Sequence, residues 1–548
     1  MEPQKKKKKH TGLIIFLSLF TVLIIVPVVA IYACFYDNTT AAFVGKDNVD
    51  TSSLFKAKAV DAFDDTATSH KISYVVKEDD LNQLLYQASK SVPDNAKGYL
   101  KKLTVSIEDD AYHFYLDATL GGFFDTRIDI KTTLSETKDA QNPENGSFIF
   151  TISDMKVGRI SGMDSLALSL AGSSLNDESL TTLFKNAGLN MKVSLTDKTI
   201  TYTKKAMIED LEKQIGGSTN AVYSAILNDF IKDDLLGFDF YQGKALTADV
   251  ALEELHTNPT YCPNDKTAPI NMSDYRGQLK TLLDKGAIET DETSQSYVFE
   301  YLVRGYTHTS DVSKTYLTGK TRDFSSIGIS DISTYEGPIN YGASTIPSLV
   351  QKDLQDSANV GFTSPILSSI SEDEITSYLE TTSIYGYSYI LSRLKDDGST
   401  YKVNAIAVDD FYAQIVQDHL YLIVGVNING YETSIIFDTL LQPSTTEYEI
   451  TLKTDKVYYG NKEASGELKA AFYDLINESF ASSGWMSFDN NSSSSTYGQI
   501  VLDFSDPIKT STYYPALQLA MTAQNKTVSI SLTGTDVSSS GALVLSLA

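Results

Sequence analysis

The chain has 548 residues, of which 42% are hydrophobic and 21% charged, a composition typical of a folded protein with several domains. Its formal net charge is −25, which excludes nucleic acid as a partner because phosphates would repel it, and disfavours flat docking on anionic lipid headgroups. Cys34 and Cys262 are the only cysteines, so the fold does not depend on disulfide bonds.

The N-terminus has the pattern of a membrane anchor. Five lysines at 5–9 precede an apolar run at 13–36 that is long enough to cross the hydrocarbon layer of about 30 Å. Lysines remain on the cytoplasmic side. The sequence therefore predicts a cytoplasmic basic tail over 1–10, a transmembrane helix over 11–36 and a cell-membrane protein whose C-terminal bulk lies outside.

Two other readings of this segment exist. A cleaved signal peptide has an apolar region of only about 7–15 residues, shorter than this one. Lipidation of Cys34 would follow Ile31-Tyr32-Ala33, in which tyrosine is bulky so close to the cysteine. The length favours an uncleaved, single-pass anchor. A long outer portion that lacks disulfides indicates a bacterial, Gram-positive envelope.

A stalk rich in Asp, Thr, Ser and Ala is expected over 37–70, followed by a first α+β module over 71–215. In KEDDLNQLLYQ (77–87), acidic residues precede leucines at helical spacing, which predicts a helix. The alternation over residues 104–134 predicts a β-hairpin or meander, and SFIFTISDMKVGRI (147–160) predicts another strand pair. LNMKVSLTDKTITYTKK (189–205) predicts a hairpin.

A helical insert is expected over 216–320. Helical periodicity is seen at 206–217, 218–237, 247–255 and 273–286, and 294–305 is a further candidate helix. This insert would either bridge the two modules or pack across one of them, and it is the expected surface for protein partners.

A second α+β module, over 321–548, repeats the order of the first. SEDEITSYLE (371–380) matches the acid-capped helix, and 418–441 matches the alternating strands. YEITLKTDKVYYG (448–460) matches FIFTISDMKVGRI (148–160), equating Thr151 with Thr451, Lys156 with Lys456 and Val157 with Val457. Further strands are predicted at 499–508 and 527–534, and a flexible loop at 488–498. The predicted fold class is α+β: a transmembrane helix, then two tandem helix-plus-antiparallel-sheet modules separated by the helical insert.

The first copy resembles the YpmS-like family of Gram-positive, single-pass, extracytoplasmic proteins. The matching stretches are KEDDLNQLLYQ, LTVSIEDDAYHFYLDATLGGF, NGSFIFTISDMKVGRIS and LNMKVSLTDKTITYTK, which cover 71–211 in the family's order. The chain departs from the family at Ser161-Gly162-Met163, where the family tends to place a proline. The resemblance implies a location on the outer face of a Gram-positive cell membrane and a small sheet-plus-helix module. It brings no catalytic residues.

Catalytic patterns are weak. SDMK (153–156) and STYK (399–402) fit Ser-x-x-Lys, but that motif requires a helix start, whereas SDMK ends a strand pattern. The acidic groups Glu108-Asp109-Asp110, Asp79-Asp80 and Asp409-Asp410 could serve acid–base chemistry or bind a cation, and are more simply helix starts and turns. We expect no catalytic, cofactor or metal site, and hence no enzyme.

Two lone side chains have simple structural explanations. His113, between Tyr112 and Phe114, is expected to face solvent or a sheet neighbour, and the six histidines show no metal-ligand spacing. Trp485 is a candidate exposed anchor, with a place in the core as the simpler explanation.

Three functions follow from these features. The 33 tyrosines and 24 phenylalanines fall in stripes that either fill a core or line an apolar groove. The first function is therefore a non-catalytic binding protein for a lipid or a lipid-linked envelope polymer. The second is a scaffold for protein partners through 216–320, and the third is a cell-wall enzyme.

Overall fold

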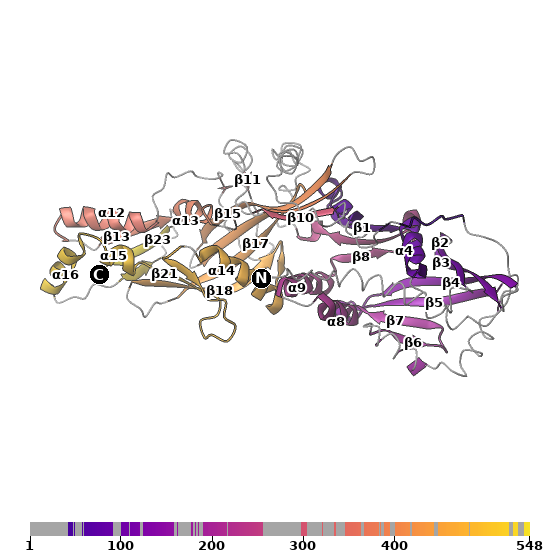
Figure 1. The fold of residues 1–548 in the computed structure, drawn as a ribbon. Helices are drawn as coiled ribbons and strands as arrows, with labels where there is room; N and C mark the ends of the chain where they lie inside the picture. The colour runs from indigo at the N-terminus through magenta and orange to yellow at the C-terminus, as the bar shows by residue number, and fades with distance from the viewer. Residues whose placement is uncertain are drawn as a thin grey trace, which may run out of the picture. The chain divides into compact units, whose positions relative to one another are not determined.

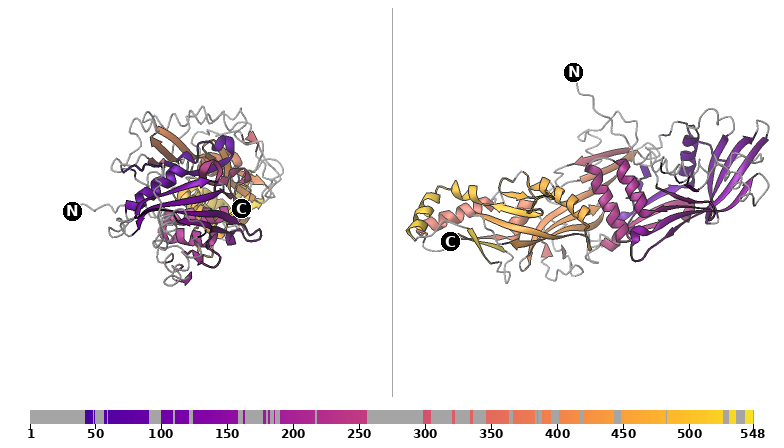
Figure 2. Two further views of the ribbon diagram at one scale, coloured as in Figure 1. Left: turned by 90° about the vertical axis from the view of Figure 1, so that its right-hand side faces the viewer. Right: turned by 90° about the horizontal axis from the view of Figure 1, so that it is seen from below.

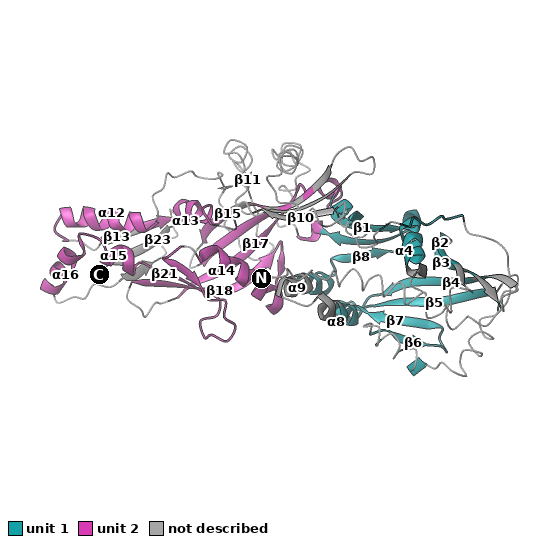
Figure 3. Cartoon of the chain, in the orientation of Figure 1, with its two compact units in different colours: residues 1–63, 71–251, 293–298 teal, residues 64–70, 252–292, 299–548 magenta. Residues whose placement is uncertain are grey.

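The computed structural model describes most of residues 42–255 and 346–547, together with the short strands 298–303, 320–321 and 334–335 (Figure 1). The longer stretches outside the described residues are 1–41, 91–99, most of 158–189, 256–297, 304–319, 322–333 and 336–345. The fold is mixed α+β with antiparallel sheets, as predicted. Two compact units are present: unit 1 consists of 1–63, 71–251 and 293–298, and unit 2 of 64–70, 252–292 and 299–548 (Figure 3).

Unit 1 begins with a strand that leads directly into a helix, β1 (Lys71–Lys77) and α4 (Glu78–Lys90). Three acidic residues in the first turn of α4 complement the positive end of the helix dipole. Leu81, Leu84 and Leu85, at helical spacing, are buried. The helix predicted from KEDDLNQLLYQ is therefore confirmed.

An antiparallel sheet of six strands follows, in the order β2-β3-β4-β5-β7-β6. Its strands are β2 (Leu100–Glu108), β3 (Ala111–Leu120), β4 (Phe124–Thr137), β5 (Ser147–Val157), β6 (Lys192–Ser194) and β7 (Thr199–Thr203). The predicted strands over 104–134 and the hairpin predicted at 189–205 are confirmed. The strand pair predicted at 147–160 is wrong, because Ser147–Val157 is one continuous strand. One face of this sheet packs on the leucines of α4 in a continuous apolar core.

The rest of unit 1 corrects a prediction. After α8 (Lys204–Ile215) and α9 (Ser218–Lys232), which lie side by side (Figure 2), come β8 (Leu236–Asp239) and β9 (Ala245–Ala251). β9 pairs with β1 in a second sheet, of order β1-β9-β8. The helix predicted at 247–255 is therefore a strand up to Ala251, and only Leu252–Leu255 is helical, as a 3-10 turn.

Unit 2 contains a nine-stranded sheet of order β10-β14-β15-β16-β17-β18-β21-β20, with β19 beside β18. Its strands are β10 (Val298–Val303), β14 (Ser388–Leu394), β15 (Tyr401–Val416), β16 (His419–Ile428), β17 (Tyr431–Gln442), β18 (Glu449–Tyr459), β19 (Lys462–Glu463), β20 (Met486–Phe488) and β21 (Gln499–Asp503). The candidate helix at 294–305 is thus the strand β10. The predicted strands over 418–441 are confirmed.

Further elements cover this sheet. A three-stranded sheet of order β13-β23-β22 is made of β13 (Ile366–Ser371), β22 (Ile530–Gly534) and β23 (Ala542–Leu547). The helices are α12 (Ile346–Asn359), α13 (Glu372–Leu379), α14 (Gly466–Phe480), α15 (Ser505–Lys509) and α16 (Tyr514–Ala523). A complete capping box between Ser371 and Glu374 starts α13, which explains why the acidic stretch 371–380 predicted it correctly.

The two units share one sheet topology, to which unit 2 adds β10, β14 and β19. In each, a strand leads into a helix, four long antiparallel strands follow, a short hairpin extends the sheet, and a three-stranded sheet contains the first strand. The order β1-β9-β8 corresponds to β13-β23-β22, and β2-β3-β4-β5-β7-β6 to β15-β16-β17-β18-β21-β20.

In unit 1, side chains of α4 satisfy the free edge of β2. The Asn82 amide accepts from the backbone N–H of Val105 at 2.7 Å and donates to its carbonyl at 2.8 Å. Glu78 accepts from the backbone N–H of Ile107 at 2.9 Å. An exposed edge strand invites pairing with other chains, so these contacts protect it.

Unit 2 uses the same device on β15, beyond the point where β14 ends. Thr376 accepts from the backbone N–H of Ala413 at 3.0 Å, and Glu372 from that of Ile415 at 2.5 Å. In both units the two helix residues are four positions apart and the two strand residues are two positions apart. The contacts therefore make Ala413 equivalent to Val105 and Ile415 equivalent to Ile107. Leu420, opposite Ile415, thereby corresponds to Tyr112.

Equivalent bulges lie farther along the sheets. The pairing shifts just before Thr132 in β4 and just before Thr439 in β17. Each threonine hydroxyl donates to a carbonyl on the preceding strand, that of Tyr112 in unit 1 and that of Leu420 in unit 2. The bulges therefore agree with the equivalence set by the helices.

Left-handed turns complete the match. The backbone N–H of Ile152 donates to Lys198 at 3.0 Å, and that of Thr454 to Gly498 at 2.9 Å. Both acceptors have positive φ, 54° and 77°. Ile152 thus corresponds to Thr454. The sequence match of Thr151 with Thr451 is therefore wrong by two residues, because the structure makes Thr151 equivalent to Lys453. The matches of Lys156 and Val157 are wrong by the same two residues.

The predicted anchor lies outside the described residues, as does the predicted helix at 273–286. None of the helices that the structure describes is long and apolar enough to span a bilayer. The predicted loop at 488–498 contains turns that are held by Asp489, whose carboxylate accepts from Thr496 at 2.5 Å.

Candidate functional site

A small apolar cavity lies inside unit 2, on the face of the nine-stranded sheet that α12, α13 and β13 cover. Its volume is about 20 Å³. Every lining side chain is apolar: Ile346, Ile370, Ile375, Leu420, Leu422, Leu452, Trp485, Met486, Ile500 and Leu502. Such a space has no polar partner to hold a water molecule, so it favours apolar atoms.

Trp485 and Met486 are held at the cavity by the start of β20. The Ser483 hydroxyl accepts from the backbone N–H of Met486 at 2.8 Å, which fixes this turn. The Trp485 ring packs edge-on against Tyr378, with centroids 4.8 Å apart, and lies 5.8 Å from Phe504. Trp485 is 7% exposed, which confirms the core role and excludes that of an exposed anchor.

The equivalent space in unit 1 is lined by larger side chains. Through the shared register, four residues of unit 1 correspond to four leucines of the cavity: Tyr112 to Leu420, Phe114 to Leu422, Phe150 to Leu452 and Tyr202 to Leu502. An aromatic ring fills more volume than an isobutyl group. The cavity therefore coincides with four aromatic-to-leucine differences.

Aromatic rings fill the core of unit 1. Phe148 lies edge-on to Phe238 with centroids 4.8 Å apart, and Tyr112 tilts against Tyr241 at 5.3 Å. The Tyr112 hydroxyl donates to the carbonyl of Phe240 at 2.5 Å, and burial raises its pKa, so it stays neutral. The described aromatic side chains on the face of the sheet that packs on α4 are thus core residues.

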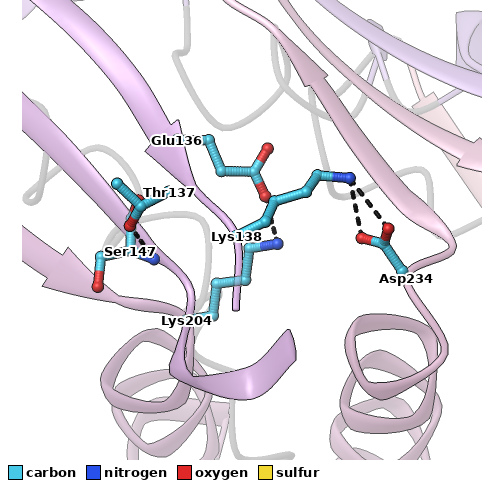
Figure 4. A network of polar contacts seen from close by, with 6 residues as sticks. All are labelled: Glu136, Thr137, Lys138, Ser147, Lys204 and Asp234. Atoms are coloured by element: carbon cyan, nitrogen blue, oxygen red, sulfur yellow. Dashed lines mark hydrogen bonds and ion pairs between the residues drawn. The ribbon is translucent and has the colours of Figure 1, made fainter. Parts of the chain in front are cut away.

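A buried ion pair lies at the junction of β4, β7 and α8 in unit 1 (Figure 4). Lys204, which is 1% exposed, contacts the Glu136 carboxylate, and its ammonium lies 5.8 Å from the centre of the Phe238 ring. Beside it, Lys138 contacts Asp234 at 2.9 Å in an exposed pair. Charges so arranged neutralise each other, so the pair is structural.

Lys204 has an apolar counterpart in unit 2. Its backbone N–H donates to Gly146 at 2.8 Å, and that of Phe504 donates to Tyr448 at 2.9 Å. Phe504 is fully buried beside Trp485. The same position is therefore ionic in unit 1 and part of the aromatic surroundings of the cavity in unit 2.

In each unit a His–Asp pair lies on the sheet face that points away from the core or cavity. Nδ1 of His113 lies 3.0 Å from the Asp129 carboxylate, which confirms the expected sheet neighbour, and His419 contacts Asp438. A general base needs a nucleophile or water within hydrogen-bonding distance. In the described part of the chain, no hydroxyl or thiol is hydrogen-bonded to either imidazole.

The Ser-x-x-Lys candidates do not form a site. Residues 153–156 lie within β5, where Ser153 donates to the carbonyl of Lys131 at 3.2 Å and an extended backbone separates it from Lys156. For 399–402, the first two residues lie outside the described part and the last two begin β15.

The acidic candidates are also dispersed. Glu108 ends β2, and Asp110 forms a turn with positive φ, while Asp109 lies outside the described residues. Asp80 pairs with Lys58 at 2.9 Å and caps the backbone N–H of Lys77. Among the described residues, no group of three potential metal ligands is present.

Sequence reasoning missed the cavity and the buried lysine. The difference between the aromatic residues of unit 1 and the leucines of unit 2 is visible in the sequence, but only the correct register aligns them. Comparison of the chain with protein-family models and with curated proteins finds no match.

Proposed function

We propose that this chain is a membrane-anchored, extracytoplasmic, non-catalytic protein that binds the acyl chain of a lipid or of a lipid-linked envelope polymer in unit 2. The observation that supports it best is the all-apolar cavity at the position where unit 1 has four aromatic side chains. We further propose that the units are two copies of one module, of which the first retains a filled core and the second has become the binding module.

Ligand entry requires the cavity to widen, because binding sites for small molecules measure about 300–1,000 Å³. The lining is suited to this change: leucine and methionine side chains repack among rotamers at low cost. The cover consists of β13, α12 and α13. Separation of α13 from β15 breaks the hydrogen bonds that Thr376 and Glu372 accept from the strand edge.

The anchor over 11–36 and the resemblance to extracytoplasmic Gram-positive proteins support a place where lipids and envelope polymers are abundant. No part of the proposal requires a cofactor. The scaffold hypothesis rests mainly on 216–320, much of which lies outside the described residues.

Trp485 provides a direct test because it is the one tryptophan of the chain and lines the cavity. The chain from residue 37 onward, purified without detergent, is titrated with a fatty acid that carries bromine on its acyl chain. Bromine quenches tryptophan only on close approach. Saturable quenching, together with an added mass in native mass spectrometry that solvent removes, is expected.

Variants locate the site. Leu422→Phe and Leu452→Phe restore the aromatic residues of unit 1 and should abolish quenching. Leu468→Phe, in the core of unit 2 but outside the cavity lining, is the matched control and should retain it. Quenching that persists in both cavity variants, or a bare polypeptide mass without quenching in the parent chain, would refute the lipid proposal and favour a protein scaffold.

A further inference from the structure

A short segment that precedes the first strand of unit 1 is bound along α4. The Gln83 side-chain oxygen accepts from the backbone N–H of Lys46 at 3.0 Å, and its amide nitrogen donates to the Lys46 carbonyl at 2.8 Å. Gln87 donates to the same carbonyl at 2.8 Å. The Gln83 amide thus gives Lys46 the two hydrogen bonds that a neighbouring strand would give.

The contacts on either side of Lys46 select particular residues. A Cβ at Gly45 would lie 2.2 Å from Cγ of Tyr86, so only glycine fits against this ring. The Tyr86 hydroxyl donates to the Asp47 carboxylate at 2.5 Å. Helix α4 therefore has a recognition site for an extended Gly-x-Asp segment, independent of the middle side chain.

Two further observations indicate a specific device. Lys102 of β2 donates to the carbonyl of Phe43, which extends the contact from α4 to the edge strand. Unit 2 lacks the site, because Ser377, Glu380 and Thr381 occupy the positions equivalent to Gln83, Tyr86 and Gln87. The fold itself therefore does not require it.

We propose that this site is a clamp: α4 grips the juxtamembrane segment Gly45–Asp47 and so holds unit 1 close to the bilayer. The proposal rests on the membrane anchor of the proposed function. Residues 37–44 separate the apolar run from the gripped segment, and eight residues span at most about 29 Å. A released segment would lengthen the tether by the residues up to Lys58, which pairs with Asp80 of α4.

Trypsin tests the grip, because it cleaves after Lys46 only when the surrounding backbone is free. The full-length chain in liposomes is digested briefly and the cleavage after Lys46 is followed by mass spectrometry. Gly45→Val should raise the rate about tenfold or more, because release by local opening is no longer needed. Gly237→Val, at an open position in β8, is the matched control and should leave the rate unchanged.

The height above the bilayer is measured in the same liposomes. A donor dye is placed at Asp79 of α4 through Asp79→Cys, with Cys34 and Cys262 changed to serine, and acceptor dyes are placed in the lipid. Energy transfer should fall with Gly45→Val and also with Gln83→Ala, which removes the amide without adding bulk. Circular dichroism checks that both variants are folded.

Equal cleavage and equal energy transfer in parent and variants would overturn the clamp. Failure of the anchor gives a different result, since the parent chain would then not float with liposomes. Loss of acyl-chain quenching at Trp485 is a third, independent readout that concerns unit 2 alone.

Discussion

At the scale of single residues, Lys204 of unit 1 is a buried charge that forms an ion pair with Glu136. Loss of one partner from a buried ion pair leaves the other charge unpaired, which costs about 3–5 kcal/mol. Lys204→Ala should therefore lower the unfolding free energy of unit 1 by about that amount. Hydrogen exchange of the backbone amides of β4 and β7 measures it.

The control removes both charges. Lys204→Met combined with Glu136→Leu leaves no buried charge unpaired, and its stability should lie within about 1 kcal/mol of the parent chain. Lys138→Ala, in the neighbouring exposed pair with Asp234, should change stability by less than about 1 kcal/mol. A large loss in the double variant would show that the pair itself stabilises the unit.

Glu372 makes the stability of unit 2 depend on pH. Burial raises its pKa from 4.5 to about 7, an effect that the hydrogen bond from Ile415 partly offsets. The unfolded chain then loses this proton at lower pH than the folded chain. Stability is full below pH 4.5 and falls as the pH rises to about 7.

Glu372→Gln removes this proton equilibrium and keeps an oxygen that can accept from Ile415. The variant should match the parent chain at pH 4 and become more stable than it between pH 4.5 and 7, with a constant difference above. Urea unfolding followed by the fluorescence of Trp485 reports on unit 2. A difference that is the same at pH 4 and pH 8 would contradict the assignment to Glu372.

At the scale of elements, the bonds from helix to strand edge are the shared device of both units. Asn82→Leu leaves the N–H and carbonyl of Val105 without their partner, and such a loss costs about 1–3 kcal/mol. We expect faster hydrogen exchange at Val105 while Ile107, held by Glu78, stays protected. Equal acceleration at both amides would show that the helix, and not Asn82, protects the edge.

The sequence predicted elements whose local signals agree with the fold. Helices α4 and α13 have acidic first turns and leucines or isoleucine at helical spacing. Most of strand β9 was predicted as a helix because TADVALEEL (247–255) has helical periodicity. Pairing with β1 over its whole length overrides that preference, and a sequence pattern does not reveal a distant partner.

The two-residue error in matching the modules has a physical cause. Side chains of a strand alternate with period two, so a shift by two residues keeps every side chain on its predicted face. Only features of the folded chain distinguish one register from the other: the hydrogen bonds from helix to strand edge, the bulges at Thr132 and Thr439, and the left-handed turns. The cavity could not be predicted for the same reason, because in the shifted register Phe150 is matched with Ile450 rather than with Leu452.

At the scale of the whole molecule, equal topology with unequal cores predicts one acyl chain per polypeptide. If the leucines create the site, Phe114→Leu combined with Phe150→Leu should open a second one in unit 1. Each such change costs about 1–3 kcal/mol, so the variant is studied at low temperature. Native mass spectrometry should then show two ligands in place of one.

The double variant also separates volume from position. Tyr112 keeps its hydrogen bond to Phe240 in this variant, so the register of β3 is preserved while the rings of Phe114 and Phe150 are removed. A second ligand would mean that ring volume alone decides which unit binds. One ligand, with unit 1 still folded by hydrogen exchange, would mean that binding also needs what unit 2 alone has around its cavity, Trp485 just before β20 and Ile346 on α12.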